Sequence, residues 1–175
     1  MQHMDDALFG IRKRMKSCTE HYDQTAVVLD TSFSVAVKED YVKWSDQLMP
    51  KVSDRLMQYV CGDRPEYGGK TWAGCQKIYF PLLLDETVMH WVMVVANVKD
   101  CLLVLYDCDR AVVRRQEELD VVMRPFLELI PQILITSRMF HEELLHQGTP
   151  WRYDRPSNIP QQDGKYGIYK LFIFS

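Results

Sequence analysis

The sequence has no run of about 18 consecutive apolar residues, the length that a helix needs to cross a bilayer. It has no cluster of Lys and Arg interleaved with aromatic residues, and its formal net charge is −3, which argues against nucleic-acid binding. Its first residues lack the basic and apolar regions of a signal peptide. These absences predict a protein that binds neither a membrane nor nucleic acid and resides in the nucleus or the cytoplasm.

Cysteine is present, but without the spacing that metal sites use. The five cysteines are irregularly spaced and include no C-x-x-C pair, so a zinc site is not expected. An odd number of cysteines without a signal peptide indicates reduced thiols. No other metal or cofactor motif occurs, and we expect no cofactor.

The 175 residues suffice for one domain with a proper core, and no linker or repeat divides them. We expect a single domain over residues 1–175, with parts of it missing at both ends. Helical patterns precede and follow a central block of strand patterns, which predicts an α+β fold. The expected helices cover residues 4–16, 34–48, 51–60, 111–130 and 132–147, with Pro125 kinking or splitting the fourth. The expected strands cover residues 77–83 (ending near Pro81), 89–98 and 101–107, with further apolar segments at 25–30 and 151–153.

Two apolar strands separated by the polar pair Lys99-Asp100 predict a buried hairpin. His90 stands at the start of the first strand and Asp107 at the end of the second. Because hairpin strands run antiparallel, these two side chains should lie close together. A His–Asp pair fixes the imidazole tautomer for general-base work. The alternative interpretation is that both residues merely cap strand ends.

A pair of glutamines, Gln161 and Gln162, follows Pro160 just before an apolar element. Side-chain amides on a proline-stiffened loop could donate hydrogen bonds to an oxyanion. Taken alone, the same residues also fit an ordinary solvated loop.

The order of these pieces is more specific than any one of them. A strand that opens with His-Trp, a strand that ends with Tyr-Asp and a later Pro-Gln-Gln before Gly-Ile-Tyr resemble the ubiquitin-like-protein-specific cysteine proteases. The best-known members of that family process and remove SUMO. Residues 77–81 resemble the strand that precedes the family's His-Trp, and the first helix resembles that of plant, transposon-associated members. The resemblance covers nearly the whole chain and implies a papain-like, adenain-like fold with a central mixed sheet flanked by helices.

The resemblance assigns roles to individual residues. His90 matches the general base and Asp107 the residue that orients it. Gln161 matches the oxyanion-hole glutamine, with Gln162 as the alternative. Trp91 matches the tryptophan that lines a narrow tunnel for the substrate's Gly-Gly tail, the alternative being a core tryptophan. The implied reaction is hydrolysis of (iso)peptide bonds after that tail, and the implied partner is a SUMO-type ubiquitin-like protein or its conjugates.

One position departs from the family pattern. The family's nucleophile is the cysteine of Asp-Cys-Gly, and the matching place here reads Lys165-Tyr166-Gly167. A phenol has a reference pKa of about 10 and is scarcely ionised at neutral pH, so Tyr166 cannot replace a thiolate. No cysteine follows Cys108, and Cys108 itself should point away from His90 because neighbouring strand residues alternate.

Three hypotheses follow from this substitution. The chain is a peptidase whose true gene sequence holds the cysteine, or a catalytically dead module that binds a ubiquitin-like protein. The third is a decayed mobile-element fragment without a present biochemical role.

Overall fold

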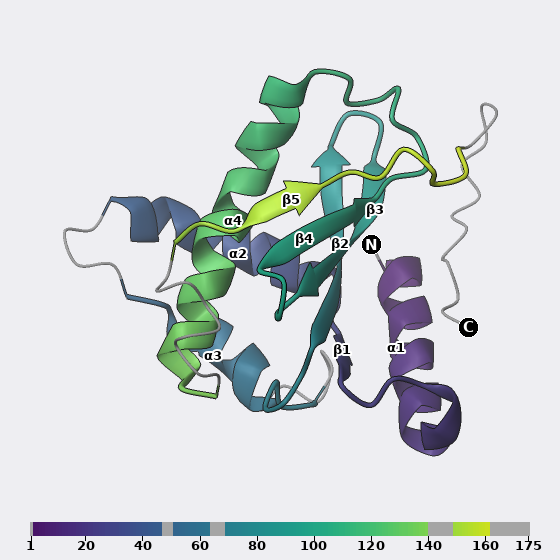
Figure 1. Cartoon of the computed structure of the whole chain (residues 1–175), viewed down its shortest axis with the longest axis vertical. Coiled ribbons are helices and arrows are strands. Elements are labelled where there is room, and N and C mark those ends of the chain that lie inside the picture. The colour runs from purple at the N-terminus through teal and green to yellow at the C-terminus, as the bar shows by residue number, and fades with distance from the viewer. Residues whose placement is uncertain (1, 47–50, 64–68, 140–148, 162–175) are drawn as a thin grey trace.

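A five-stranded mixed sheet lies at the centre of the computed structural model, which describes residues 2–46, 51–63, 69–139 and 149–161 (Figure 1). The strands are β1 (Ala26–Val28), β2 (Lys77–Asp85), β3 (His90–Asn97), β4 (Leu102–Tyr106) and β5 (Arg152–Asp154). The helices are α1 (Gln2–Ser17), the short 3-10 helix η1 (Thr19–His21), α2 (Thr31–Ser45), α3 (Asp54–Cys61) and α4 (Gln116–Ser137).

The strands lie side by side in chain order, from β1 to β5. β3 pairs with β2 and with β4 in antiparallel orientation. β1 pairs with β2, and β5 with β4, in parallel orientation. The predicted hairpin, the predicted short strand near residue 152 and the α+β class with a mixed sheet are therefore confirmed.

Helices cover both faces of the sheet. One face packs against α2, α3 and α4 and forms the larger apolar cluster, while α1 lies on the other face (Figure 1). Members of the larger cluster alternate along the central strands, as the pleat requires: Ile78, Phe80, Leu82, Val92, Val94, Ala96, Leu103 and Leu105. On the other face, Leu8 and Met15 of α1 pack with Ala26 and Val28. The sheet thus separates two apolar layers.

Helices α2 and α3 begin at capping residues rather than where their apolar patterns begin. The Asp30 carboxylate accepts a hydrogen bond from the Phe33 N–H at 3.2 Å, so α2 starts at Thr31, earlier than predicted. The Ser53 hydroxyl accepts one from the Leu56 N–H at 3.2 Å, so α3 starts at Asp54, later than predicted. Both differences follow from satisfying the first free N–H groups of a helix.

Strand β2 runs on to Asp85, so the prediction that it ends near Pro81 is wrong. The carbonyl of Tyr79 accepts a hydrogen bond from Leu29 on the β1 side of the strand. Because backbone groups alternate along a strand, the N of Pro81 faces that same side, beyond the end of β1 at Val28. Pro81 therefore removes no donor from the pairing with β3, and the strand continues.

Helix α4 is one helix from Gln116 to Ser137 and contains both Pro125 and Pro131. The prediction of two helices divided near residue 131 is wrong over this range, and residues 140–147 lie outside the described residues. Pro131 lacks the N–H that would reach the carbonyl of Leu127. That carbonyl accepts the Trp151 N–H at 2.9 Å instead, which compensates the missing helical bond. Of the described helices, α4 included, none is long and apolar enough to cross a membrane.

The cap of α2 makes stability depend on pH. Asp30 is 2% exposed, and burial, followed by the charge of Asp5, raises its pKa from the ordinary 3.8 to about 6, while Arg12 opposes the shift. Between these two values the folded state binds more protons than the unfolded state. Protonation of Asp30 therefore stabilises the folded state at low pH. The free energy of unfolding falls as the pH rises from about 4 through about 6.

We expect Asp30→Asn to remove this dependence, because asparagine keeps the capping oxygen but carries no charge. Above pH 6 the variant should be more stable by about 1–2 kcal/mol, less than the shift alone would give, since Arg12 loses a counter-charge. Urea unfolding at pH 4.5 and 7.5 measures this, with exposed Asp54→Asn as the control. An unchanged pH slope in Asp30→Asn would contradict the expectation.

Candidate active site

His90 and Asp107 meet at one edge of the β3–β4 pair. Met93 lies opposite Tyr106, and continuing that register by one residue sets Asp107 opposite Val92. His90 and Asp107 are then diagonal neighbours on the same face of the sheet. His90 Nε2 lies 2.9 Å from Asp107 Oδ1. The predicted proximity of the two side chains is confirmed.

The turn before β3 fixes the position of His90, the first residue of the strand. Asp85 Oδ1 accepts the Thr87 N–H at 2.7 Å and the Val88 N–H at 3.2 Å, so one side chain satisfies two backbone donors of the turn. Met89 then adopts a left-handed conformation with φ of 54°, which is uncommon outside glycine. The turn therefore gives the backbone a defined conformation where it enters β3 at His90.

The hydrogen bonds around Asp107 determine its charge and the tautomer of His90. Burial opposes ionisation, but hydrogen bonds from His90, the Asp109 N–H and Arg155 outweigh it, and the pKa of Asp107 is lowered. An ionised carboxylate only accepts hydrogen bonds. In the neutral imidazole the proton is therefore assigned to His90 Nε2, which leaves Nδ1 as a free base.

Arg155 completes the site, and the sequence analysis missed it. Its Nη2 and Nε donate to Asp107 Oδ2 at 2.5 and 3.0 Å, and its Nη1 donates to the Val113 carbonyl at 2.8 Å. The side chains of Arg155 and Asp107 are 11% and 0% exposed. No local pattern indicates this contact, because it depends on the parallel pairing of β5 with β4.

Gln161 follows β5, and its side chain lies beside Asp107, against the backbone of the loop that follows β4. Its Nε2 donates to the carbonyls of Asp107 and Ile159, both at 3.0 Å, and its Oε1 accepts the Arg110 N–H at 3.1 Å. The amide thus pins this loop, and it would have to release one of these bonds to donate to an oxyanion. The alternative, Gln162, lies outside the described residues.

Trp91 lies on the opposite face of β3 from His90, because strand residues alternate. It is 7% exposed and pairs across the sheet with Leu83. Met93, two residues further on, packs against the α1 cluster, which identifies this as the α1 face. Among the described residues, Trp91 belongs to neither core cluster. Its role as a tunnel wall stays a prediction.

Neither Cys108 nor Cys75 has the properties of a nucleophile paired with His90. Burial, followed by the charge of Asp107, raises the pKa of the Cys108 thiol, and no hydrogen bond joins it to His90 within the described ranges. Burial raises the pKa of Cys75 to about 12. Tyr166, at the predicted position of the nucleophile, lies outside the described residues.

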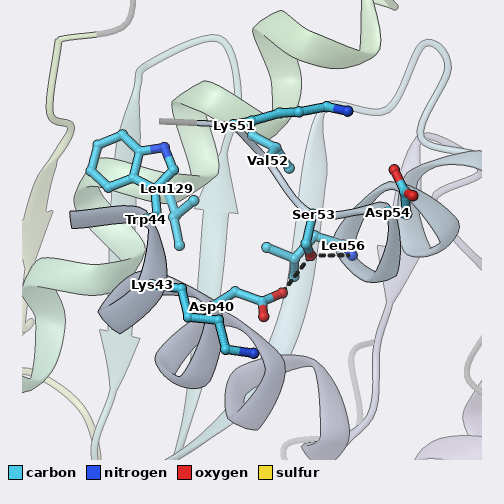
Figure 2. A pocket seen from close by; sticks show the side chains of 9 residues that line it. All are labelled: Asp40, Lys43, Trp44, Lys51, Val52, Ser53, Asp54, Leu56 and Leu129. Carbon is cyan, nitrogen blue, oxygen red and sulfur yellow. Dashed lines mark hydrogen bonds between the residues drawn. The ribbon is translucent and has the colours of Figure 1, made fainter. Parts of the chain in front are cut away.

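A pocket between α2, α3 and α4 contains polar side chains, two of which, Asp40 and Ser53, belong to the N-terminal cap of α3 (Figure 2). The Ser53 hydroxyl donates to Asp40 Oδ2 at 2.5 Å while it caps α3. Figure 2 shows both bonds at the rim between Asp40 and Leu56, with Trp44 on the other side of the pocket. In the part of the chain that the structure describes, no group of three His, Cys, Asp or Glu is placed to hold a metal ion.

The tautomer of His90 is testable through Asp107→Asn. The amide oxygen must face Arg155, which only donates, so the amide N–H is turned toward His90. We expect His90 to change from the Nε2–H to the Nδ1–H tautomer, which removes the free base at Nδ1. Histidine ¹H–¹⁵N correlation spectra report the tautomer directly. Asp100→Asn, in the exposed turn of the same hairpin, is the control, and an unchanged His90 tautomer in Asp107→Asn would refute the assignment.

Comparison with known proteins identifies the family of the chain. A family model for the Ulp1 protease family, C-terminal catalytic domain, matches residues 1–173. Searches of curated proteins and of solved structures find no match. The matched range includes every strand of the sheet and the His90–Asp107 pair. The chain therefore belongs to the Ulp1 family of cysteine proteases, whose members act on ubiquitin-like proteins such as SUMO.

Proposed function

We propose that this chain is a peptidase domain for a SUMO-type ubiquitin-like protein, built to hydrolyse the (iso)peptide bond after a Gly-Gly tail and impaired by Tyr166. The observation that carries the proposal is the buried hydrogen bond between His90 Nε2 and Asp107 Oδ1. It leaves Nδ1 free to act as a base, which is what a thiol nucleophile requires.

The proposed chemistry needs a cysteine at the position of Tyr166. The thiol would give its proton to His90 Nδ1, and Asp107 would stabilise the resulting imidazolium. The thiolate would attack the carbonyl carbon of the last glycine, the amine would leave with the imidazolium proton, and water would hydrolyse the thioester. With a phenol at this position the first step fails at neutral pH.

A second candidate function is a catalytically dead module that binds a ubiquitin-like protein. The sequence favours it, because no cysteine follows Cys108 while His90, Asp107 and Trp91 are all present. Binding would then use the tail-recognising surface without turnover. The decayed fragment remains the third hypothesis, and it predicts neither binding nor a cooperative thermal transition.

Repair of the nucleophile tests whether the rest of the site works. We expect no hydrolysis of a panel of ubiquitin-like precursors by the unaltered chain. Two repaired chains should be assayed beside it: Tyr166→Cys, and Tyr166→Cys with one aspartate inserted before it, which restores Asp-Cys-Gly and lengthens this segment by one residue. At least one should cleave after Gly-Gly, and His90→Gln in the same repaired chain should abolish cleavage.

Each other outcome has a definite meaning. Cleavage by the unaltered chain would show that Tyr166 is not the defect, and Cys108→Ala would then test whether the thiol next to Asp107 is the nucleophile. Silence from both repaired chains, if circular dichroism shows them folded, would contradict a site held in working geometry around His90.

The Gly-Gly preference can be tested on the unaltered chain without catalysis. If Trp91 lines a narrow tunnel, a ubiquitin-like protein that ends in Gly-Gly should bind, and one that ends in Ala-Ala should bind at least about tenfold more weakly. Calorimetric titration of both ligands gives the two Kd values. Equal affinities would contradict the tunnel at Trp91. If no ubiquitin-like protein binds, the hypothesis of a binding module is contradicted as well.

A further inference from the structure

The Asp107 carboxylate is 0% exposed and depends on a single residue for half of its hydrogen bonding. Its Oδ1 receives bonds from His90 and from the Asp109 N–H, both at 2.9 Å. Within the described residues, its Oδ2 receives bonds from Arg155 alone. A buried carboxylate oxygen without a partner disfavours the charged form strongly. The state of Asp107 therefore depends on Arg155.

The Arg155 guanidinium is itself held at a fixed place. The preceding residue, Asp154, pairs with Val104 at the end of β5, so the sheet positions the backbone. The third donor, Nη1, is bound to the Val113 carbonyl on the way to α4. A planar fork with three bonds in two directions has little freedom to turn, unlike a lysine ammonium.

We propose that Arg155 is a positioning residue for His90, acting through Asp107. By occupying Oδ2 with two donors it keeps the carboxylate ionised and directs Oδ1 at His90 Nε2. The imidazole is thereby held as the Nε2–H tautomer with Nδ1 free. This inference rests on the proposed function, in which His90 is the base.

A purely structural ion pair is the competing interpretation, and stability alone cannot separate the two. Tyr153, in β5 and two residues before Arg155, supplies a matched control. Its hydroxyl is hydrogen-bonded to Asp120 and Gln116 of α4, so Tyr153→Phe weakens the attachment of β5 without touching Asp107. A positioning role requires that Arg155 variants change the imidazole and that Tyr153→Phe does not.

The experiment uses the full chain labelled with ¹⁵N-histidine, with the His90 signals assigned by their absence in His90→Gln. At pH 7 we expect Arg155→Met to convert His90 from one tautomer to a mixture and to speed exchange of the Nε2 proton with water at least tenfold. Arg155→Lys should give a smaller change in the same direction, because it keeps the charge but loses the fork. Tyr153→Phe should lower the Tm and leave the His90 signals unchanged.

Two results would overturn the proposal. The first is a folded Arg155→Met chain whose His90 tautomer and exchange rate equal those of the unaltered chain. If Arg155→Met does not fold, an unchanged His90 in Arg155→Lys has the same meaning. The second is a change of His90 in Tyr153→Phe as large as in the Arg155 variants. Since this readout needs no nucleophile, it can fail while the hydrolysis and binding assays succeed, and the reverse.

Discussion

The register between β3 and β4 is the constraint on which the rest of the site depends. It brings together two side chains that are 17 residues apart in the chain, and it places both on the face covered by α2 and α4. A shift of one residue would turn one of them to the α1 face and would remove the apolar residues of that strand from the larger core cluster at the same time. The packing of the core therefore protects the geometry of His90 and Asp107, although neither residue is apolar.

Three separate parts of the chain meet at Asp107. The start of β3 contributes His90, the segment after β5 contributes Arg155 and Gln161, and the loop after β4 contributes the Asp109 N–H. The bonds to its carboxylate from His90, the Asp109 N–H and Arg155 outweigh the effect of burial and lower its pKa, whereas Gln161 donates to the backbone carbonyl of Asp107. In the described residues both carboxylate oxygens of Asp107 thus have hydrogen-bond partners, His90 among them, whereas the sequence alone indicates the altered nucleophile position.

The sequence predicted those features that depend on short stretches of chain. The hairpin was readable because its strands and turn are contiguous, and the His90–Asp107 contact followed from that hairpin. Arg155 was not readable, because a parallel pairing between β4 and β5 leaves no local pattern in either strand. The continuity of α4 was missed for a similar reason, since the group that satisfies the Leu127 carbonyl belongs to Trp151, far along the chain. The starts of α2 and α3 differ from the prediction because the caps Asp30 and Ser53, and not the apolar patterns, set where these helices begin.

The bond from Trp151 to Leu127 gives Pro131 of α4 a structural role in the fold. A helix with a full set of its own donors would offer no open carbonyl at this point, and the chain before β5 would lose a docking point there. The defect in α4 thus anchors the short edge strand that leads to Arg155. A sequence change that made the helix more regular at residue 131 would place a second donor at the same carbonyl and loosen that strand. A complete set of helical hydrogen bonds in α4 would therefore weaken the attachment of β5, the strand that leads to Arg155.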